Sequence, residues 1–151
     1  MRDGRVRGWT FYCKSSGLEV SLAERAGGVR VRFFPLEAGG RERQVVLLLR
    51  PEEAVRRASV LVASRVGREG SSRVVYHELQ GRASYITVDA FQRDGRLRIG
   101  LTAVSQNGAD ARRVPFLFTD EGLELFVMLL KQLAVESCYI ESHGRKLNRT
   151  M

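Results

Sequence analysis

Arginine is the residue type in this sequence whose chemistry is most informative. The chain has 22 arginines and three lysines. A guanidinium group is planar, grips phosphate through paired hydrogen bonds and stacks on nucleobases, whereas an ammonium group is a point charge. Residues 1–118 carry 21 basic and 12 acidic side chains, and residues 119–151 carry four basic and five acidic ones. The excess positive charge therefore belongs to the first part of the chain and indicates a polyanionic partner.

Arginines and aromatic residues alternate with apolar residues in several segments. Successive side chains of a strand point to opposite faces, so this spacing predicts sheets with one apolar face and one face of guanidinium groups and rings. Such a face suits a single nucleic-acid strand, because arginines bind its phosphates and rings stack on its unpaired bases. For Trp9, burial in the core is an equal alternative. The candidate binding residues are Trp9, Arg30, Arg32, Phe34, Tyr85, Phe91, Arg93, Arg96, Arg98 and Arg113.

The sequence does not indicate a catalytic, metal or cofactor site. Cys13 and Cys138 lie far apart, and His77 and His143 have no companion at ligand spacing, which argues against zinc and against a catalytic triad. Glycine motifs for phosphate binding and the nucleophile elbow are missing. Asp89 sits on the predicted basic face but lacks a nucleophile or metal partner. We therefore expect a protein that is not an enzyme and needs no cofactor.

Turn signals predict the strands. Asp94-Gly95 and Asn107-Gly108 are strong two-residue hairpin turns, because type I′ turns need two residues with positive φ. They make residues 84–118 a three-stranded meander in which Leu101 faces Val114. One face of this meander is nearly all apolar, and a one-residue slip would destroy that arrangement.

The N-terminal part repeats the design. Gly27-Gly28, taken as a two-residue turn, places Arg25 opposite Arg30 and Ala23 opposite Arg32. Residues 73–79 fit either a strand or part of a longer connection. The other strand candidates are 9–13, 18–26, 29–35 and 45–49, the last apolar enough to be a buried strand.

Two helices are predicted. Pro51 begins the first, followed by two acidic residues that suit a helix N-terminus. Thr119 caps the second, which should run to about Glu141 and leave a polar, basic tail. This helix has two apolar sides, so one can pack on the sheet and the other needs a partner. We expect self-association, with burial inside one chain as the alternative. The expected interface residues are Leu123, Phe126, Leu130 and Leu133.

A family resemblance supports this interpretation. The segment Val29-Arg-Val-Arg-Phe-Phe-Pro35, the Gly39-Gly40 loop, the run 45–49, the helix start at 50–54 and the long apolar terminal helix resemble the ThermoDBP-related proteins of thermophilic archaea. That resemblance implies single-stranded nucleic-acid binding in a cleft with an apolar floor and a basic rim, and oligomers formed through C-terminal helices. It places Arg30, Arg32 and Phe34 loosely in the cleft. PC4 and Whirly proteins are a related alternative that implies the same function and a similar dimer.

Together these features predict an α+β fold, with an antiparallel sheet of hairpins and a meander packed on one helix. Residues 1–118 would form the basic nucleic-acid-binding part and residues 119–151 the oligomerisation helix and tail. The expected function is largely sequence-independent binding of single-stranded DNA, with RNA possible on the same chemistry. The alternative is a non-enzymatic adaptor that binds an acidic protein. The apolar runs are too short to span a membrane and the N-terminus has no secretory pattern, so a cytoplasmic location is expected.

Overall fold

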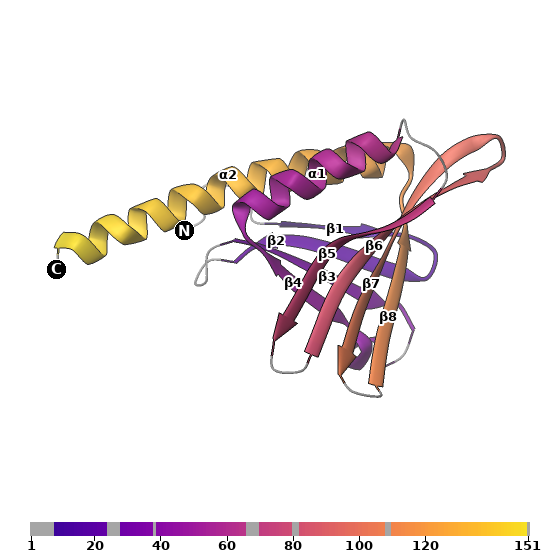
Figure 1. The fold of residues 1–151 in the computed structure, drawn as a ribbon, viewed down its shortest axis with the longest axis horizontal. Coiled ribbons are helices and arrows are strands. Elements are labelled where there is room, and N and C mark those ends of the chain that lie inside the picture. The colour runs from indigo at the N-terminus through magenta and orange to yellow at the C-terminus, as the bar shows by residue number, and fades with distance from the viewer. Residues whose placement is uncertain are drawn as a thin grey trace.

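Two four-stranded antiparallel sheets and two helices make up the fold of the residues described by the computed structural model (Figure 1). Those residues are 8–23, 28–37, 39–65, 70–79, 82–107 and 110–150; for 41, 62–65, 70–79, 107 and 140–150 only the backbone is described. The elements are β1 Gly8–Tyr12, β2 Ser16–Leu22, β3 Val29–Pro35, the 3-10 helix η1 Gly40–Arg43, β4 Val45–Leu49, α1 Pro51–Arg65, β5 Gly70–Leu79, β6 Arg82–Arg93, β7 Arg96–Asn107, β8 Asp110–Leu117 and α2 Asp120–Thr150.

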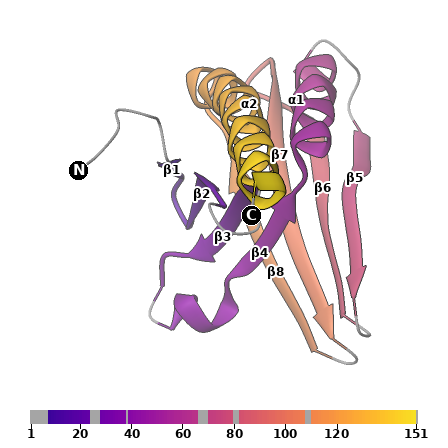
Figure 2. The ribbon, with the colours of Figure 1, turned by 90° about the vertical axis from the view of Figure 1, so that its left-hand side faces the viewer.

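Strands β1 to β4 form sheet A and strands β5 to β8 form sheet B, each in sequence order. The two helices lie side by side along one end of the sheets, with α2 packed on β1, β2 and β3 and α1 packed mainly on sheet B (Figures 1 and 2). One continuous apolar core joins both sheets and both helices. The predicted α+β class is confirmed, but both helices cover the sheets rather than one.

Each helix begins where the sequence predicts, for the predicted physical reason. The backbone N–H of Arg50 donates to the Glu53 carboxylate at 3.3 Å, directly before Pro51. Thr119 accepts a hydrogen bond from the backbone N–H of Gly122 through its hydroxyl at 3.0 Å. In both contacts a side-chain oxygen accepts a hydrogen bond from a backbone N–H at a helix start, where such N–H groups have no partner inside the helix. Helix α2 continues to Thr150, nine residues beyond the predicted end at Glu141.

The predicted faces of the hairpin strands are right in the described residues, but the pairing is right at only one of the three predicted hairpins. Strands β6 and β7 pair as expected around Asp94-Gly95. Leu101 pairs with Phe116 rather than with Val114, a shift of two residues. Arg32 pairs with Glu19 rather than with Ala23, a shift of four. Even shifts keep every side chain on its predicted face, so the apolar pattern alone could not exclude them.

Strand β4 differs from the prediction of a buried strand. Val45, Leu47 and Leu49 are buried, while Val46 and Leu48 are exposed on the other face. The reason is topological, since sheet A is covered by the core on one face only and β4 is its edge strand. Residues 73–79, left undecided from the sequence, belong to β5, the edge strand of sheet B that pairs with β6. Arg25 and the turn residues Gly27 and Gly108 lie outside the described residues.

Helix α2 corrects the predicted oligomer interface. Leu123, Phe126, Leu130 and Leu133 are at most 3% exposed in the single chain, so they cannot form a contact with another copy. They pack into the chain's own core, where Phe126 contacts the rings of Phe11 and Phe118. The second apolar side of the helix is the open one: the exposed side chains are Leu125, Met128, Val135 and Tyr139.

A buried hydroxyl fixes the position of α2 on sheet A. Ser137 is fully buried within the apolar side of the helix and accepts a hydrogen bond from the backbone N–H of Gly28. Gly28 has φ of 115°, and a Cβ there would lie 2.6 Å from the Leu49 carbonyl oxygen. Glycine is therefore required at this position both by its conformation and by the close approach of β4. The bond satisfies a polar group that burial would otherwise make costly.

No helix in the described part of the chain is long and apolar enough to cross a membrane.

Candidate nucleic-acid interface

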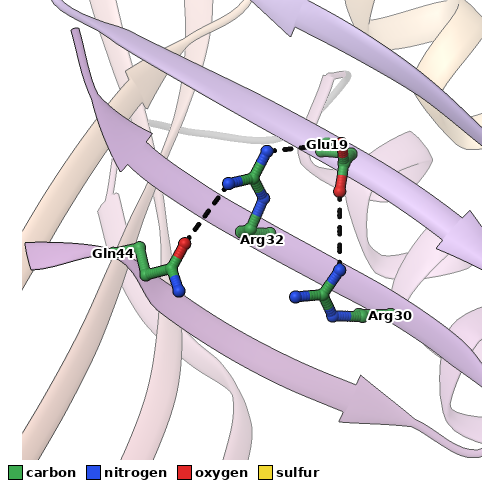
Figure 3. Close-up of polar contacts among 4 residues, drawn as sticks. All are labelled: Glu19, Arg30, Arg32 and Gln44. Carbon is green, nitrogen blue, oxygen red and sulfur yellow. Dashed lines mark hydrogen bonds and ion pairs between the residues drawn. The ribbon is translucent and has the colours of Figure 1, made fainter. Parts of the chain in front are cut away.

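Sheet A places three candidate residues on its outer face, away from the core. Arg30 and Arg32 point outward from β3, and both contact Glu19 of β2 (Figure 3). The guanidinium of Arg30 lies 3.6 Å from one carboxylate oxygen, and that of Arg32 lies 3.3 Å from the other. Arg32 also donates to the side-chain oxygen of Gln44 at 3.3 Å. Both arginines are thus already engaged by groups of their own chain.

Phe34, the third candidate on this face, has its ring covered. The ring lies across Gly17 so closely that a Cβ there would sit 2.2 Å from its nearest ring carbon. Arg32 stands over the ring, 4.5 Å from its centroid, in a cation–π contact. Tyr12 meets it edge to face at 6.3 Å and is itself 66% exposed. Tyr12, rather than Phe34, is therefore the accessible ring of this cluster.

Sheet B carries six further candidates: five on β6 and β7, and Arg113 on β8. Arg96 and Arg98 each have a guanidinium nitrogen 3.9 Å from a carboxylate oxygen of Asp120, at the start of α2. Arg93 is exposed beside the hairpin turn. Tyr85 and Phe91 are half-buried on the same outer face. Asp89 accepts a hydrogen bond from the Thr102 hydroxyl at 3.4 Å, which gives this carboxylate a local polar partner.

The two sheets meet where the β1–β2 turn crosses the edge strand β8. The buried hydroxyl of Ser16 donates to the backbone carbonyl of Pro115, which joins the start of β2 to the edge of sheet B. Pro115 has no N–H to donate, and it lies on an edge strand, where that absence is tolerated. A hollow lies on each side of this contact, and Ser15 and Pro115 line both.

We call these two hollows together the β8 groove. The first has a volume of about 300 Å³, and the second about 410 Å³. Both are within the range of small-ligand pockets. The first is lined by Cys13, Lys14, Ser15, Asp89, Phe91, Gly100, Leu101, Thr102, Pro115, Phe116 and Leu117. The second is lined by Ser15, Ser16, Pro35, Glu37, Arg43, Ala111, Arg112, Arg113, Val114 and Pro115.

The groove is rich in cations. Arg43 forms an ion pair with Glu37. Lys14, Arg112 and Arg113 are exposed and form no ion pair with any residue in the described ranges. Phosphate groups in the groove would therefore meet positive charge without first displacing a carboxylate from these three side chains.

Phe91 supplies an aromatic surface in the first hollow. Gly100 faces Asp89 across the strand pair, and a Cβ on Gly100 would lie 3.8 Å from the Phe91 ring. The absence of a side chain at Gly100 leaves space beside that ring. An unpaired base that enters this hollow would find a ring to stack on, next to the cation of Lys14.

Cys13 lines the same hollow and has a perturbed thiol. Burial raises its pKa, but hydrogen bonds with the Ser16 side chain and with backbone groups of Leu117, Ser15 and Ser16 together outweigh that effect, so the pKa is lowered. The Ser16 hydroxyl lies 3.1 Å from the sulfur. Cys13 is therefore a more reactive thiol than an ordinary cysteine at neutral pH.

The structure brings together only part of the predicted site. Phe91 and Arg113 line the β8 groove, whereas the outer face of sheet A holds Arg30, Arg32 and Phe34. Trp9 is 58% exposed at the edge of sheet A, on the side of the sheet that faces the core. The binding residues predicted from the sequence did not include Tyr12, Lys14, Arg43 or Arg112. The alternation of residues shows which side chains point outward, but not which strand ends the other sheet approaches.

No group of three metal-binding side chains occurs among the residues that the structure describes.

Comparison with known proteins places the fold. No protein-family model matches the chain, and no curated protein matches it in sequence. Among solved structures, WHY3 from Arabidopsis thaliana is similar over 95% of both chains, with a TM-score of 0.63 and 15% identity. The plant transcriptional regulator PBF-2 matches 95% of this chain and 87% of its own, with a TM-score of 0.61 and 17% identity. WHY1 from Arabidopsis thaliana matches 84% of this chain and 87% of its own, with a TM-score of 0.60 and 15% identity.

These neighbours bear on the resemblances drawn from the sequence. The chain has the same fold as the WHY1 and WHY3 structures. None of the three neighbours is a ThermoDBP-related protein, and nothing in the fold points to a thermophilic archaeon.

Proposed function

We propose that this protein binds single-stranded DNA, largely without sequence preference, in the β8 groove. The carrying observation is that Lys14 lines the first hollow with the ring of Phe91, while Arg112 and Arg113 line the second. None of these three cations forms an ion pair with the described residues. Cations bind phosphates of any sequence, and a ring stacks on any unpaired base. A duplex has its bases already stacked and paired, so it gains nothing from Phe91.

The fold comparison supports this proposal. One neighbour is described as a plant transcriptional regulator, a role that nucleic-acid binding would serve. Both resemblances drawn from the sequence, to the ThermoDBP-related and to the Whirly proteins, imply single-stranded nucleic-acid binding. No enzymatic activity is part of the proposal.

The direct test is fluorescence anisotropy with labelled oligo-dT, the matching RNA and a duplex of the same length, at two salt concentrations. We expect the single strand to bind more tightly than the duplex, with an affinity that falls steeply as salt rises. Equal or tighter binding of the duplex would overturn the proposal. An adaptor for an acidic protein is the rival function, and it predicts that an acidic polypeptide displaces oligo-dT more readily than unlabelled oligo-dT does.

We further propose that a second copy of the chain covers the outward side of α2. Leu125, Met128, Val135 and Tyr139 are 43% to 67% exposed and follow one another at steps of three, seven and four residues, which keeps them on one side of the helix. Large apolar side chains gathered on one side of a helix mark an interaction surface. An oligomer would present two or more β8 grooves, so a long strand should bind more tightly than a short one.

Light scattering tests this assembly. Met128→Glu should yield monomers, because Met128 is 62% exposed in the single chain and the new charge would lie in the proposed contact. Leu130→Ala should instead lower the melting temperature, because Leu130 is in the core, where such a truncation costs about 2–5 kcal/mol. A monomeric unmodified protein at micromolar concentration would contradict the proposed assembly and its avidity, while leaving the groove proposal intact.

A further inference from the structure

The outer face of sheet A holds one carboxylate between two arginines. Glu19 pairs across β2 and β3 with Arg32, and Arg30 lies two residues along the same strand, so both point to the same side. One oxygen of Glu19 contacts each guanidinium, at 3.3 Å and 3.6 Å (Figure 3). In the described part of the strands of sheet A, Glu19 is the single acidic residue.

The two arginines differ in how firmly they are held. Arg32 has three partners: Glu19, Gln44 and the ring of Phe34. Its side chain is 23% exposed, and its Nε is buried without a partner. Among the residues that the structure describes, Arg30 has only the longer contact with Glu19, and its side chain is 43% exposed. Arg32 is therefore fixed within the sheet, whereas Arg30 is able to exchange its carboxylate for another anion.

The neighbours of this pair favour such an exchange. Ser21 and Leu48 flank Arg30 across the sheet, and neither carries a charge. Thr10 lies on the other side of Glu19, also uncharged. Loss of the carboxylate would therefore leave the described strand residues of this face with positive charge alone, open to the phosphate of a nucleic-acid strand.

We infer that Glu19 is an internal competitor for phosphate that sets how strongly the outer face of sheet A contributes to strand binding. This inference rests on the proposed function. In the free protein Glu19 neutralises Arg30, and a phosphodiester group replaces it when a strand extends onto this face. Arg32 acts as a positioning residue, since it holds the other carboxylate oxygen of Glu19. The competition favours ligands that also fill the β8 groove over polyanions that offer charge alone, because specificity is a difference between two affinities.

Glu19→Gln tests this role. The amide keeps the shape of the side chain and one acceptor for Arg32, but it no longer neutralises Arg30. We expect the affinity for oligo-dT to rise roughly two- to fivefold, the range that exposed ion pairs span. The salt dependence should steepen by about 0.7 in slope for one additional phosphate contact.

Two further variants make the test specific. Glu52→Gln adds the same unit of charge on α1, where Glu52 is 70% exposed and pairs with Arg50, so it controls for net charge. Combining Glu19→Gln with Arg30→Ala should remove the gain, because Arg30 is the group that Glu19→Gln releases. Glu19→Asp shortens the carboxylate so that it cannot reach both arginines, and it should give a smaller gain in the same direction.

The outcomes separate this inference from the proposed function. Binding by the unmodified protein with no gain in Glu19→Gln, or a gain equal to that of Glu52→Gln, overturns the role of Glu19 alone. A gain that persists after Arg30→Ala also overturns it. Failure of the unmodified protein and of both glutamine variants to bind oligo-dT overturns the proposed function and this inference with it.

Discussion

The cations on the open faces of the two sheets and the cations of the β8 groove differ in how they are neutralised. On the open faces, Glu19 engages Arg30 and Arg32, and Asp120 engages a second pair at residues 96 and 98. In the groove, Lys14, Arg112 and Arg113 have no such carboxylate among the described residues. An arginine that points outward is therefore not always available to bind a phosphate.

The same distinction separates the aromatic rings. The ring of Phe34 packs on Gly17 and Arg32 lies over it, so these contacts cover the surface on which a base would stack. Phe91 borders a hollow and has no ring contact with another aromatic side chain in the described ranges. Partners, rather than residue type or direction, decide which side chains can receive a ligand.

The largest effect should come from the rings. Phe91→Ala should weaken oligo-dT binding by about 1–3 kcal/mol through the loss of a stacked base. Phe34→Ala should change binding much less and should lower the unfolding free energy instead, because its ring is packed against its own sheet. Anisotropy and thermal melting on both variants measure the two quantities. Equal binding losses in the two variants would break the distinction.

The groove cations come next. Arg112→Ala combined with Arg113→Ala should reduce the affinity roughly tenfold and should lower the salt slope by about 1.4, which corresponds to two phosphate contacts. Arg50→Ala combined with Arg56→Ala removes the same charge at the start of α1 and within it, and serves as the control. A matching loss in that control would mean that net charge, not the groove, governs binding.

Substitutions of the arginines on the open faces should have smaller effects, on stability for Arg32 and on binding for Arg30 and Arg98. Arg32→Ala should lower the unfolding free energy by about 1 kcal/mol, because it removes two polar contacts and a cation–π contact that are partly exposed to solvent. Arg30→Ala combined with Arg98→Ala should weaken oligo-dT binding only about two- to threefold, because each arginine must first leave a carboxylate. Denaturant unfolding and anisotropy measure these effects. A loss as large as that of the groove double variant would show that the carboxylates do not compete.

The sequence predicted the faces of the strands far better than their pairing. Alternation fixes which side of a sheet a residue occupies, and Arg30, Arg32 and Phe34 do lie opposite to Val31 and Phe33. It leaves the length of a turn undetermined, because a shift by two or four residues preserves both faces. The expected pairing put Ala23 opposite Arg32, so the contact with Glu19 could not be foreseen.

Helix α2 shows a second limit of sequence-based prediction. Both of its apolar sides are visible in the sequence, but only tertiary packing decides which one faces the core. Ser137 marks the buried side, since its hydroxyl is satisfied by the backbone of Gly28, a residue 109 positions away in the chain. The β8 groove is equally nonlocal, because it depends on Ser16 reaching Pro115, 99 residues away.

The smallest expected effect is a change in the chemistry of one thiol, and it reports directly on groove occupancy. The lowered pKa of Cys13 populates its thiolate at a lower pH than that of an ordinary cysteine. Alkylation by iodoacetamide should therefore proceed faster than for an unfolded-chain thiol at neutral pH. Its rate should fall as the pH drops through the lowered pKa. Because the folded pKa lies below the unfolded one, this group stabilises the fold above the unfolded pKa, and that contribution is lost as the pH falls.

A bound strand should slow the reaction of Cys13 several-fold. The strand would fill the hollow that Cys13 lines, and its phosphates would raise the pKa of the nearby thiol, so access and reactivity fall together. Cys138 is exposed on α2 and serves as an internal control whose rate should not respond to the strand. Mass spectrometry of samples quenched over time, with and without saturating oligo-dT, follows both sites. Equal protection of both cysteines would indicate a change in assembly. An unchanged Cys13 rate in a protein that binds oligo-dT would place the strand on the open faces instead. The strand would then have to displace the carboxylates of Glu19 and Asp120 from their arginines.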